Sequence, residues 1–217
     1  PSGRFETGGG TTFYGRHRGS FYALSSSGVR EVIPETDRAM GWAALLLSQR
    51  PYARAALLLG EVPLAVGLAM ESLRPDLEIV WCPADPGYGA GLLQSVREAG
   101  VATRIRAAGA TPRRYLSDPA SPLFDAVLVR PPAATSLAGA VWREAEFLQA
   151  VRQVTRRSGV ALFGLDCAGA VVTREQGALL ERFVRQIRQA WPESGTLAAG
   201  AGGWWVAAQV PGLTYGA

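Results

Sequence analysis

The residues Gly60-Glu61-Val62-Pro63 follow the apolar segment 55–59 and precede a second apolar stretch. A hydrophobic strand that passes through glycine into a helix brings backbone N–H groups to the helix N-terminus, where a ligand can dock. Such turns usually carry two or three glycines, because side chains block the approach of a ligand to the backbone. Only Gly60 remains here, so the sequence predicts the turn of a nucleotide-type cofactor fold without its usual phosphate- or ribose-binding glycines.

The composition argues against several catalytic chemistries. All 22 basic side chains are arginine, so no lysine is present for a Walker-type phosphate loop or a Schiff base. His17, the only histidine, lies in a Gly- and Arg-rich stretch, which disfavours a Ser–His–Asp triad and a His-rich metal site. Cys82 and Cys167 each adjoin an apolar run, and we interpret them as buried free thiols in a reducing, cytoplasmic setting. We therefore expect no metal.

The formal net charge is +4 and the isoelectric point is about 9.5, but the arginines are spread along the chain. The densest group, residues 104–114, has the pattern of a solvated helical face rather than of a nucleic-acid footprint, which needs basic residues on one face with aromatics. No apolar run is long enough for a transmembrane helix, and residues 1–18 do not resemble a signal peptide. Because the chain begins at Pro1 rather than Met, it is interpretable as a fragment or as a processed product.

Short apolar segments alternate with helical patterns over most of the chain. Residues 1–34 predict β-hairpins, and residues 34–37 are expected to open a helix that runs to Gln49. The strands expected after them are 55–59, 77–82, 101–106, 124–129, 159–165, 196–199 and 204–210. The helices expected are 63–73, 87–99, 142–156 and 174–190, with a helical turn at 112–116. This alternation predicts an α/β fold with a mostly parallel, Rossmann-like sheet and an antiparallel C-terminal hairpin. The predicted division is a β-hairpin region, 1–34, and a Rossmann-like domain, 35–217.

An ordered set of short motifs resembles the spermidine synthase family of polyamine aminopropyltransferases. The motifs are Phe13-Tyr14-Gly15, Pro34 with the helix to Gln49, Ala55 to Glu61, Trp81 to Pro86, Phe124 to Val129, Glu146-Phe147-Leu148 to Gly159-Val160, Trp191-Pro192, and Gly203 to Ala207. The resemblance covers about Phe13 to Val210, and is nearest to divergent relatives that follow membrane-spanning segments. It implies the sheet of class I S-adenosylmethionine-dependent methyltransferases and, commonly, a homodimer. Of the adjacent Trp204 and Trp205, which should face opposite sides of a strand, one is expected at an interface or against a helix.

The chain departs from the family where the resemblance implies polar chemistry. Pro83 stands at the acidic residue that binds the cofactor ribose, and Ala110 or Thr111 at an Asp beside the adenine. Arg130, before Pro131-Pro132, occupies the position of the catalytic Asp that holds and deprotonates the amine. On the helix to Gln49, Met40 and Ala44 replace an acidic and His pair. Asp85 is retained as a possible ribose ligand, although a helix cap is the simpler interpretation.

These departures leave three hypotheses. The first is a catalytically degenerate domain that acts as a scaffold or regulatory module, attached to or associated with a membrane segment outside this chain. The second is an active transferase, aminopropyl or methyl, with an altered acceptor: Arg130 would bind an anion and Glu61 would replace the ribose acid. The third, less favoured, is a nucleic-acid methyltransferase. Gly60, Glu61 and Asp85 are the predicted cofactor-binding residues, and the candidate ligands are S-adenosylmethionine and its decarboxylated form.

Overall fold

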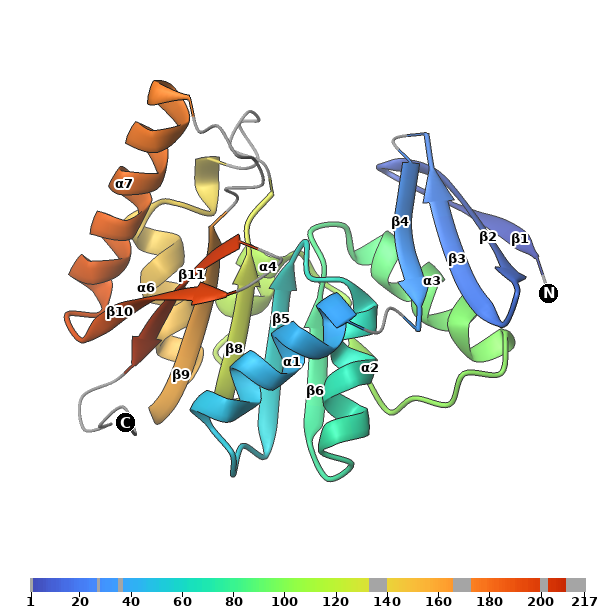
Figure 1. Cartoon of the computed structure of the whole chain (residues 1–217), viewed down its shortest axis with the longest axis horizontal. Helices are drawn as coiled ribbons and strands as arrows, with labels where there is room; N and C mark the ends of the chain where they lie inside the picture. Colours follow the sequence, from blue (N-terminus) through green and yellow to red (C-terminus); the bar gives the residue numbers. More distant parts are fainter. Residues whose placement is uncertain are drawn as a thin grey trace.

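The computed structural model describes residues 2–26, 28–34, 37–132, 140–165, 173–199 and 203–209. Two sheets organise these residues (Figure 1). The first is an antiparallel meander of β1 (Gly3–Thr7), β2 (Gly10–His17), β3 (Ser20–Ser25) and β4 (Gly28–Ile33). The helix α1 (Asp37–Gln49) leads from it to the second sheet.

The second sheet has seven strands in the order β10-β11-β9-β8-β5-β6-β7. Its strands are β5 (Ala55–Gly60), β6 (Glu78–Cys82), β7 (Arg106–Ala107), β8 (Phe124–Arg130), β9 (Thr155–Leu165), β10 (Ser194–Ala199) and β11 (Gly203–Gln209). The five strands from β9 to β7 are parallel, and β11 and β10 continue the sheet as an antiparallel hairpin. The predicted α/β fold, with its mostly parallel sheet, its C-terminal hairpin and a separate small β-sheet, is therefore confirmed.

Helices cover both faces of the large sheet. They are α1, α2 (Leu64–Leu73), α3 (Pro86–Glu98), α4 (Pro112–Leu116), α6 (Ala145–Val154) and α7 (Arg174–Ala190). One core joins α1, α2 and α3 to alternate residues of the sheet such as Leu58 and Leu128, and the other joins α4, α6 and α7 to Leu57 and Val129. Because β5 is buried on both faces, its sequence is an uninterrupted apolar run.

The four-stranded sheet contributes side chains to the first core, which contains α1, α2 and α3. Phe21, Ala23 and Ile33 are buried together with residues of α1, α2 and α3. Phe5 of β1 lies against α3, where a Cβ added to Gly91 would be 2.6 Å from its ring. No strand pairing joins the two sheets within the described residues, but a continuous apolar contact does. The division of the chain at residue 34 stays a prediction.

Several element boundaries differ from the sequence expectation. β1 lies inside the region 1–34 that was predicted to form β-hairpins, although its residues alternate only weakly and Gly8, Gly9 and Gly10 follow it closely. The strand predicted at 101–106 is reduced to Arg106–Ala107, which pair with β6 only at Val80 and Trp81. The helix predicted to reach residue 156 ends at Val154, because Thr155 already pairs with Phe124 as the start of β9.

Candidate functional site

A cavity of about 240 Å³ lies where the carboxyl ends of β5, β6 and β8 meet β4. Ligands of open α/β sheets bind outside these strand ends, at the point where the strand order reverses. Here the reversal falls between β5, which pairs with both neighbours, and β8. The predicted site residues Gly60, Glu61, Asp85 and Arg130 all line this one cavity. The remaining lining residues are Val29, Arg30, Glu31, Val62, Pro63, Trp81, Pro83, Ala84 and Tyr88.

Gly60 makes the turn at the end of β5. Its φ is +83°, a left-handed conformation that favours glycine. The next N–H, of Glu61, donates to the carbonyl oxygen of Arg130 at 2.8 Å, which extends the pairing of β5 with β8. A Cβ at Gly60 would collide with that carbonyl and lie 2.8 Å from the Trp142 ring. The glycine is thus required by the packing of the chain itself.

The carboxylate of Glu31 in β4 binds the N–H groups at the N-terminus of α2. It accepts hydrogen bonds from the N–H groups of Leu64 at 2.7 Å and Ala65 at 3.5 Å, and the residue is only 4% exposed. The helix α2 begins at Leu64, after Pro63, so Glu61 precedes its first turn. A buried carboxylate at a helix N-terminus is stabilised by the unpaired N–H groups and the helix dipole. Sequence reasoning assigned no role to Glu31, because nothing in a β-hairpin indicates which helix it will contact.

Asp85 is the N-cap of α3. Its carboxylate accepts hydrogen bonds from the N–H groups of Gly87 at 2.9 Å and Tyr88 at 3.2 Å, and from Gly9 of the β1–β2 turn at 3.3 Å. Burial alone would raise the pKa of Asp85, but hydrogen bonds from the Thr7 side chain and these backbone groups outweigh it and lower the pKa. The cap that the sequence analysis considered is present, and Asp85 also holds the small sheet to α3.

Aromatic side chains close the deep end of the cavity. The indole Nε1 of Trp81 donates to the carbonyl oxygen of Val62 at 2.8 Å, and Tyr88 packs edge-on against the Trp81 ring. The guanidinium of Arg30 lies 5.1 Å from the centre of the Tyr88 ring. Burial, with the negative charge of Glu31 as a smaller cause, raises the pKa of Tyr88, so its hydroxyl is protonated at neutral pH.

Arg130 lies at the end of β8, beside α1. Its guanidinium carbon is 5.0 Å from the centre of the Trp42 ring, and the guanidinium of Arg38 lies 4.8 Å from the same ring. Its Nη1 also donates to the carbonyl oxygen of Glu61 at 3.5 Å. Met40 and Ala44 of α1, which stand where the family resemblance implies an acidic and His pair, are exposed and do not line the cavity.

The remaining predicted positions offer little chemistry. Pro83 lines the cavity and packs against α3, where a Cβ at Gly89 would lie 2.6 Å from its ring. Ala110 presents its carbonyl oxygen to the thiol of Cys82 at 3.5 Å. Burial raises the pKa of Cys82 to about 12, so this thiol is protonated at neutral pH, as a structural cysteine should be. Cys167 lies outside the described residues.

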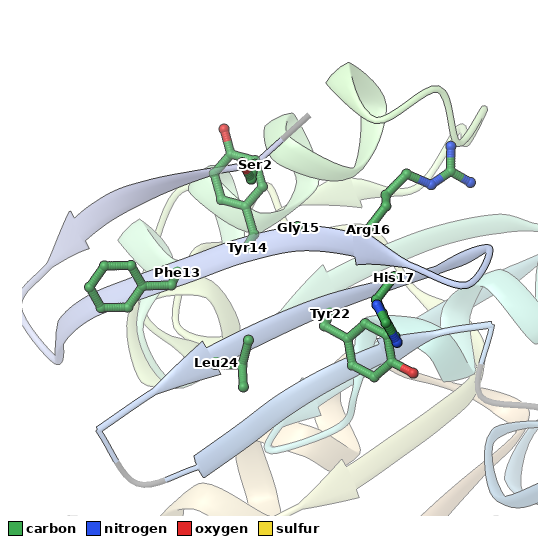
Figure 2. Close-up of a pocket in the computed structure, with 8 residues that line it drawn as sticks. All are labelled: Ser2, Phe13, Tyr14, Gly15, Arg16, His17, Tyr22 and Leu24. Atoms are coloured by element: carbon green, nitrogen blue, oxygen red, sulfur yellow. The ribbon is translucent and has the colours of Figure 1, made fainter.

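A second hollow, of about 460 Å³, lies on the four-stranded sheet around Gly15 (Figure 2). Phe13, Gly15, Tyr22 and Leu24 share the sheet face opposite to that of Phe21 and Ala23, because they are paired with one another in register. His17 lies on this same face. Its lining also includes the polar residues Ser2 and Arg16, so the hollow is a mixed polar and apolar surface of the four-stranded sheet.

The described residues hold no group of three or more His, Cys, Asp or Glu side chains that could bind a metal ion. No helix in the same residues combines the length and apolar character that a bilayer crossing requires.

Comparison with known proteins gives the fold. No protein-family model matches the chain, and no curated protein matches it in sequence. A probable spermidine synthase from Corynebacterium glutamicum matches 99% of this chain and 82% of its own, at 10% identity and a TM-score of 0.70. A spermidine synthase in complex with the transition-state analogue AdoDATO matches 99% of this chain and 74% of its own, at 14% identity and a TM-score of 0.63.

Methyltransferases share only part of this architecture. Human methyltransferase-like protein 13, in complex with SAH, matches 79% of this chain and 79% of its own, at 19% identity and a TM-score of 0.55. At these identities the likeness shows a class I methyltransferase-like, transferase-type fold and no more. The spermidine synthases match almost the whole chain, so their match takes in the four-stranded sheet.

The cleft does not fit an S-adenosyl nucleoside in the way that the family resemblance implies. Its volume of about 240 Å³ lies below the roughly 300–1,000 Å³ of ordinary ligand pockets. The N–H groups at the start of α2 already bind Glu31, and Trp142 lies against Gly60. Pro83, where the ribose acid is expected, offers neither a charge nor a donor. The polar groups of the cleft are thus largely bound to one another.

Proposed function

We propose that this chain is a spermidine synthase-like domain with a degenerate active site, which serves as a scaffold or regulatory module rather than as a standard aminopropyltransferase. The match of two spermidine synthases to 99% of the chain supports the architecture in this proposal. The observation that carries it is the self-occupied cleft, in which Glu31 and Asp85 bind helix N–H groups of their own chain.

Aminopropyl transfer requires an amine that is held by carboxylates, deprotonated and aligned with a sulfonium carbon. Arg130, a permanent cation, lines the cavity on the side where the resemblance implies the base. It repels a polyamine, and Glu31 and Asp85 are engaged with backbone N–H groups. Among the described carboxylates that line the cavity, Glu31 and Asp85 are therefore not placed to act as that base, and Glu61 is exposed beside Arg130.

The test is an assay for spermidine with the full chain, decarboxylated S-adenosylmethionine and putrescine. We expect no spermidine above the level of a reaction without protein. Product formation that scales with protein concentration would refute the degenerate-site proposal.

An active transferase with an altered acceptor is the second candidate, favoured by the position of Arg130 and Glu61 on one cavity wall. It requires that the cleft open to admit S-adenosylmethionine or its decarboxylated form. Calorimetry with both compounds and with methylthioadenosine tests it, and a lack of heat with all three rejects it.

The sequence-based predictions about partners belong to the same proposal. A homodimer is expected from the family resemblance, as is attachment to a membrane segment outside this chain, with a cytoplasmic location. Light scattering of the purified chain measures its mass in solution, and the mass of a single chain would reject the homodimer. A nucleic-acid partner is not proposed.

A further inference from the structure

A row of side chains crosses the outer face of the four-stranded sheet, which is the face turned away from the shared core. The strand register pairs Arg4 of β1 with Phe13 of β2, and Phe13 with Leu24 of β3. Leu24 is paired in turn with Val29 of the edge strand β4. Paired residues of neighbouring antiparallel strands lie side by side on one face of a sheet, whereas Phe21 on the opposite face is buried in the core. The outer face therefore presents one arginine and three apolar side chains in a line across all four strands.

The three apolar members of this row are well exposed. Phe13 is 52% exposed, Leu24 40% and Val29 59%. The next row adds Tyr22 and Val32, which are paired with each other and partly buried. Figure 2 shows Phe13, Tyr22 and Leu24 on the neighbouring strands β2 and β3. Single exposed apolar side chains are ordinary, but a contiguous group of them marks a contact surface.

The exposed charges of the same sheet are mainly positive. Within residues 2–26 and 28–34, the exposed charged side chains are those of Arg4, Arg16, Arg18, Arg30 and Glu6. The one exposed glutamate accepts hydrogen bonds from the Thr11 hydroxyl. An apolar row is thus bordered by a surface of net positive charge.

An anionic bilayer surface matches both properties. Association with such a surface grows with the apolar area that enters it and with the attraction between basic side chains and anionic headgroups. A second copy of the chain would instead place a surface of the same sign against this one, and like charges across an interface are unfavourable. Charge therefore favours the bilayer over a second copy.

We propose that the outer face of the four-stranded sheet lies on an anionic membrane surface. Phe13, Leu24 and Val29 enter the headgroup region, and Arg4 and Arg18 contact the lipid phosphates. The inference goes beyond the proposed function, because membrane contact at this face does not depend on what the cleft binds.

The test is co-sedimentation of the full chain with sucrose-loaded vesicles at physiological ionic strength. One set of vesicles is phosphatidylcholine alone, and in the other about one third of the lipid is phosphatidylserine. We expect the partition onto the anionic vesicles to be at least about tenfold stronger than onto the neutral ones. Added sodium chloride should weaken it, because salt screens exposed charges.

Two substitutions separate the apolar and the charged contributions. Phe13→Ala should weaken binding to the anionic vesicles at least about fivefold, because the exposed half of this ring loses its contact with lipid. Arg4→Gln should weaken it about fivefold, which is the share of one basic side chain near an anionic surface. Both residues are exposed, so circular dichroism of the two variants should match wild type.

Matched controls remove the same kinds of side chain elsewhere. Tyr52 is 91% exposed in the loop between α1 and β5, and Arg185 lies on α7, at the opposite end of the molecule from the four-stranded sheet (Figure 1). Tyr52→Ala and Arg185→Gln should bind the anionic vesicles as wild type does. Equal losses in the controls would overturn the inference.

Three further outcomes would also overturn it. They are no binding to the anionic vesicles, equal binding to both kinds of vesicle, and binding that salt does not weaken. If the chain binds no vesicles and light scattering shows a dimer that Phe13→Ala dissociates, the outer face belongs to a second copy. Spermidine formation by a chain that binds the anionic vesicles would refute the degenerate-site proposal and leave this inference standing.

Discussion

Gly60 and Gly100 have almost the same backbone conformation, with φ of +83° and +84°, but different surroundings. Nothing lies within 4 Å of a Cβ added at Gly100, whereas at Gly60 the carbonyl of Arg130 and the ring of Trp142 block it. Alanine substitutions at these two glycines therefore separate the energetic cost of the left-handed conformation from the cost of a Cβ that collides with its neighbours.

We expect Gly100→Ala to lower the free energy of unfolding by about 1–2 kcal/mol, the cost of that conformation for a non-glycine residue. Gly60→Ala should lower it by about 2–5 kcal/mol, because overpacking adds to the same cost. Urea unfolding measures both. Equal losses in the two variants would mean that Gly60 is not held by its packing.

Asp85 gives the chain an acid-sensitive contact. Folding lowers its pKa, so its contribution to stability is present above the unfolded pKa of about 3.9 and is lost as the pH falls through the lower folded value. Asp85→Asn keeps the helix cap, since Asn and Asp cap almost equally well, but removes this titration. The stability difference between wild type and Asp85→Asn should therefore be largest near neutral pH and shrink at about pH 3. Denaturant unfolding of both proteins at the two pH values measures this difference. If the difference is the same at both pH values, the titration of Asp85 does not contribute to stability.

At the scale of elements, β4 and α2 depend on each other through Glu31. Glu31→Gln keeps an acceptor and loses the interaction with the helix dipole, so we expect a loss of about 1 kcal/mol in the free energy of unfolding. Glu31→Leu leaves buried N–H groups of α2 without an acceptor, and the loss should rise to about 2–3 kcal/mol. Thermal and urea unfolding report both values.

Glu6→Gln is the control for Glu31. Glu6 lies on the same sheet but is exposed and accepts only from the Thr11 hydroxyl, so its substitution should change stability by less than about 0.5 kcal/mol. If Glu31→Leu were as mild as this control, the contact between β4 and α2 would not stabilise the domain.

At the scale of the whole molecule, the two sheets share one core and should unfold together. All six tryptophans lie outside the four-stranded sheet, so their fluorescence reports the large sheet, while far-ultraviolet circular dichroism reports both. Arg16 also ties β2 to the end of α3 through the Ala99 carbonyl at 2.8 Å. We expect the two signals to give coincident urea transitions.

A matched pair of phenylalanines tests the contact between the sheets. Phe5 packs on Tyr88 and Gly91, so Phe5→Ala should lower the free energy of unfolding by about 2–3 kcal/mol. Both transitions should then move together to a lower urea concentration. Phe13 is 52% exposed on the other sheet face, and Phe13→Ala should cost less than about 1 kcal/mol. A dichroism transition that precedes the fluorescence transition would show that the small sheet unfolds alone.

The sequence by itself determined the order of elements and the class of fold. Apolar runs such as 55–60 indicate parallel strands because both of their faces are buried, and the pattern of α1 indicates one buried face. It also located Gly60, Glu61, Asp85 and Arg130 at strand ends, because the ends of parallel strands are where side chains of different strands meet.

Only the tertiary structure decided how those residues are used. Glu31 and Trp142 are 29 residues before and 82 residues after Gly60 in the chain, and no local pattern ties either to this turn. The contact of Arg130 with the Trp42 ring likewise joins the end of β8 to α1, which is far from it in the chain. Hydrophobic periodicity is a local signal that fixes elements, whereas the partners of polar groups in a cleft are fixed by how the elements pack.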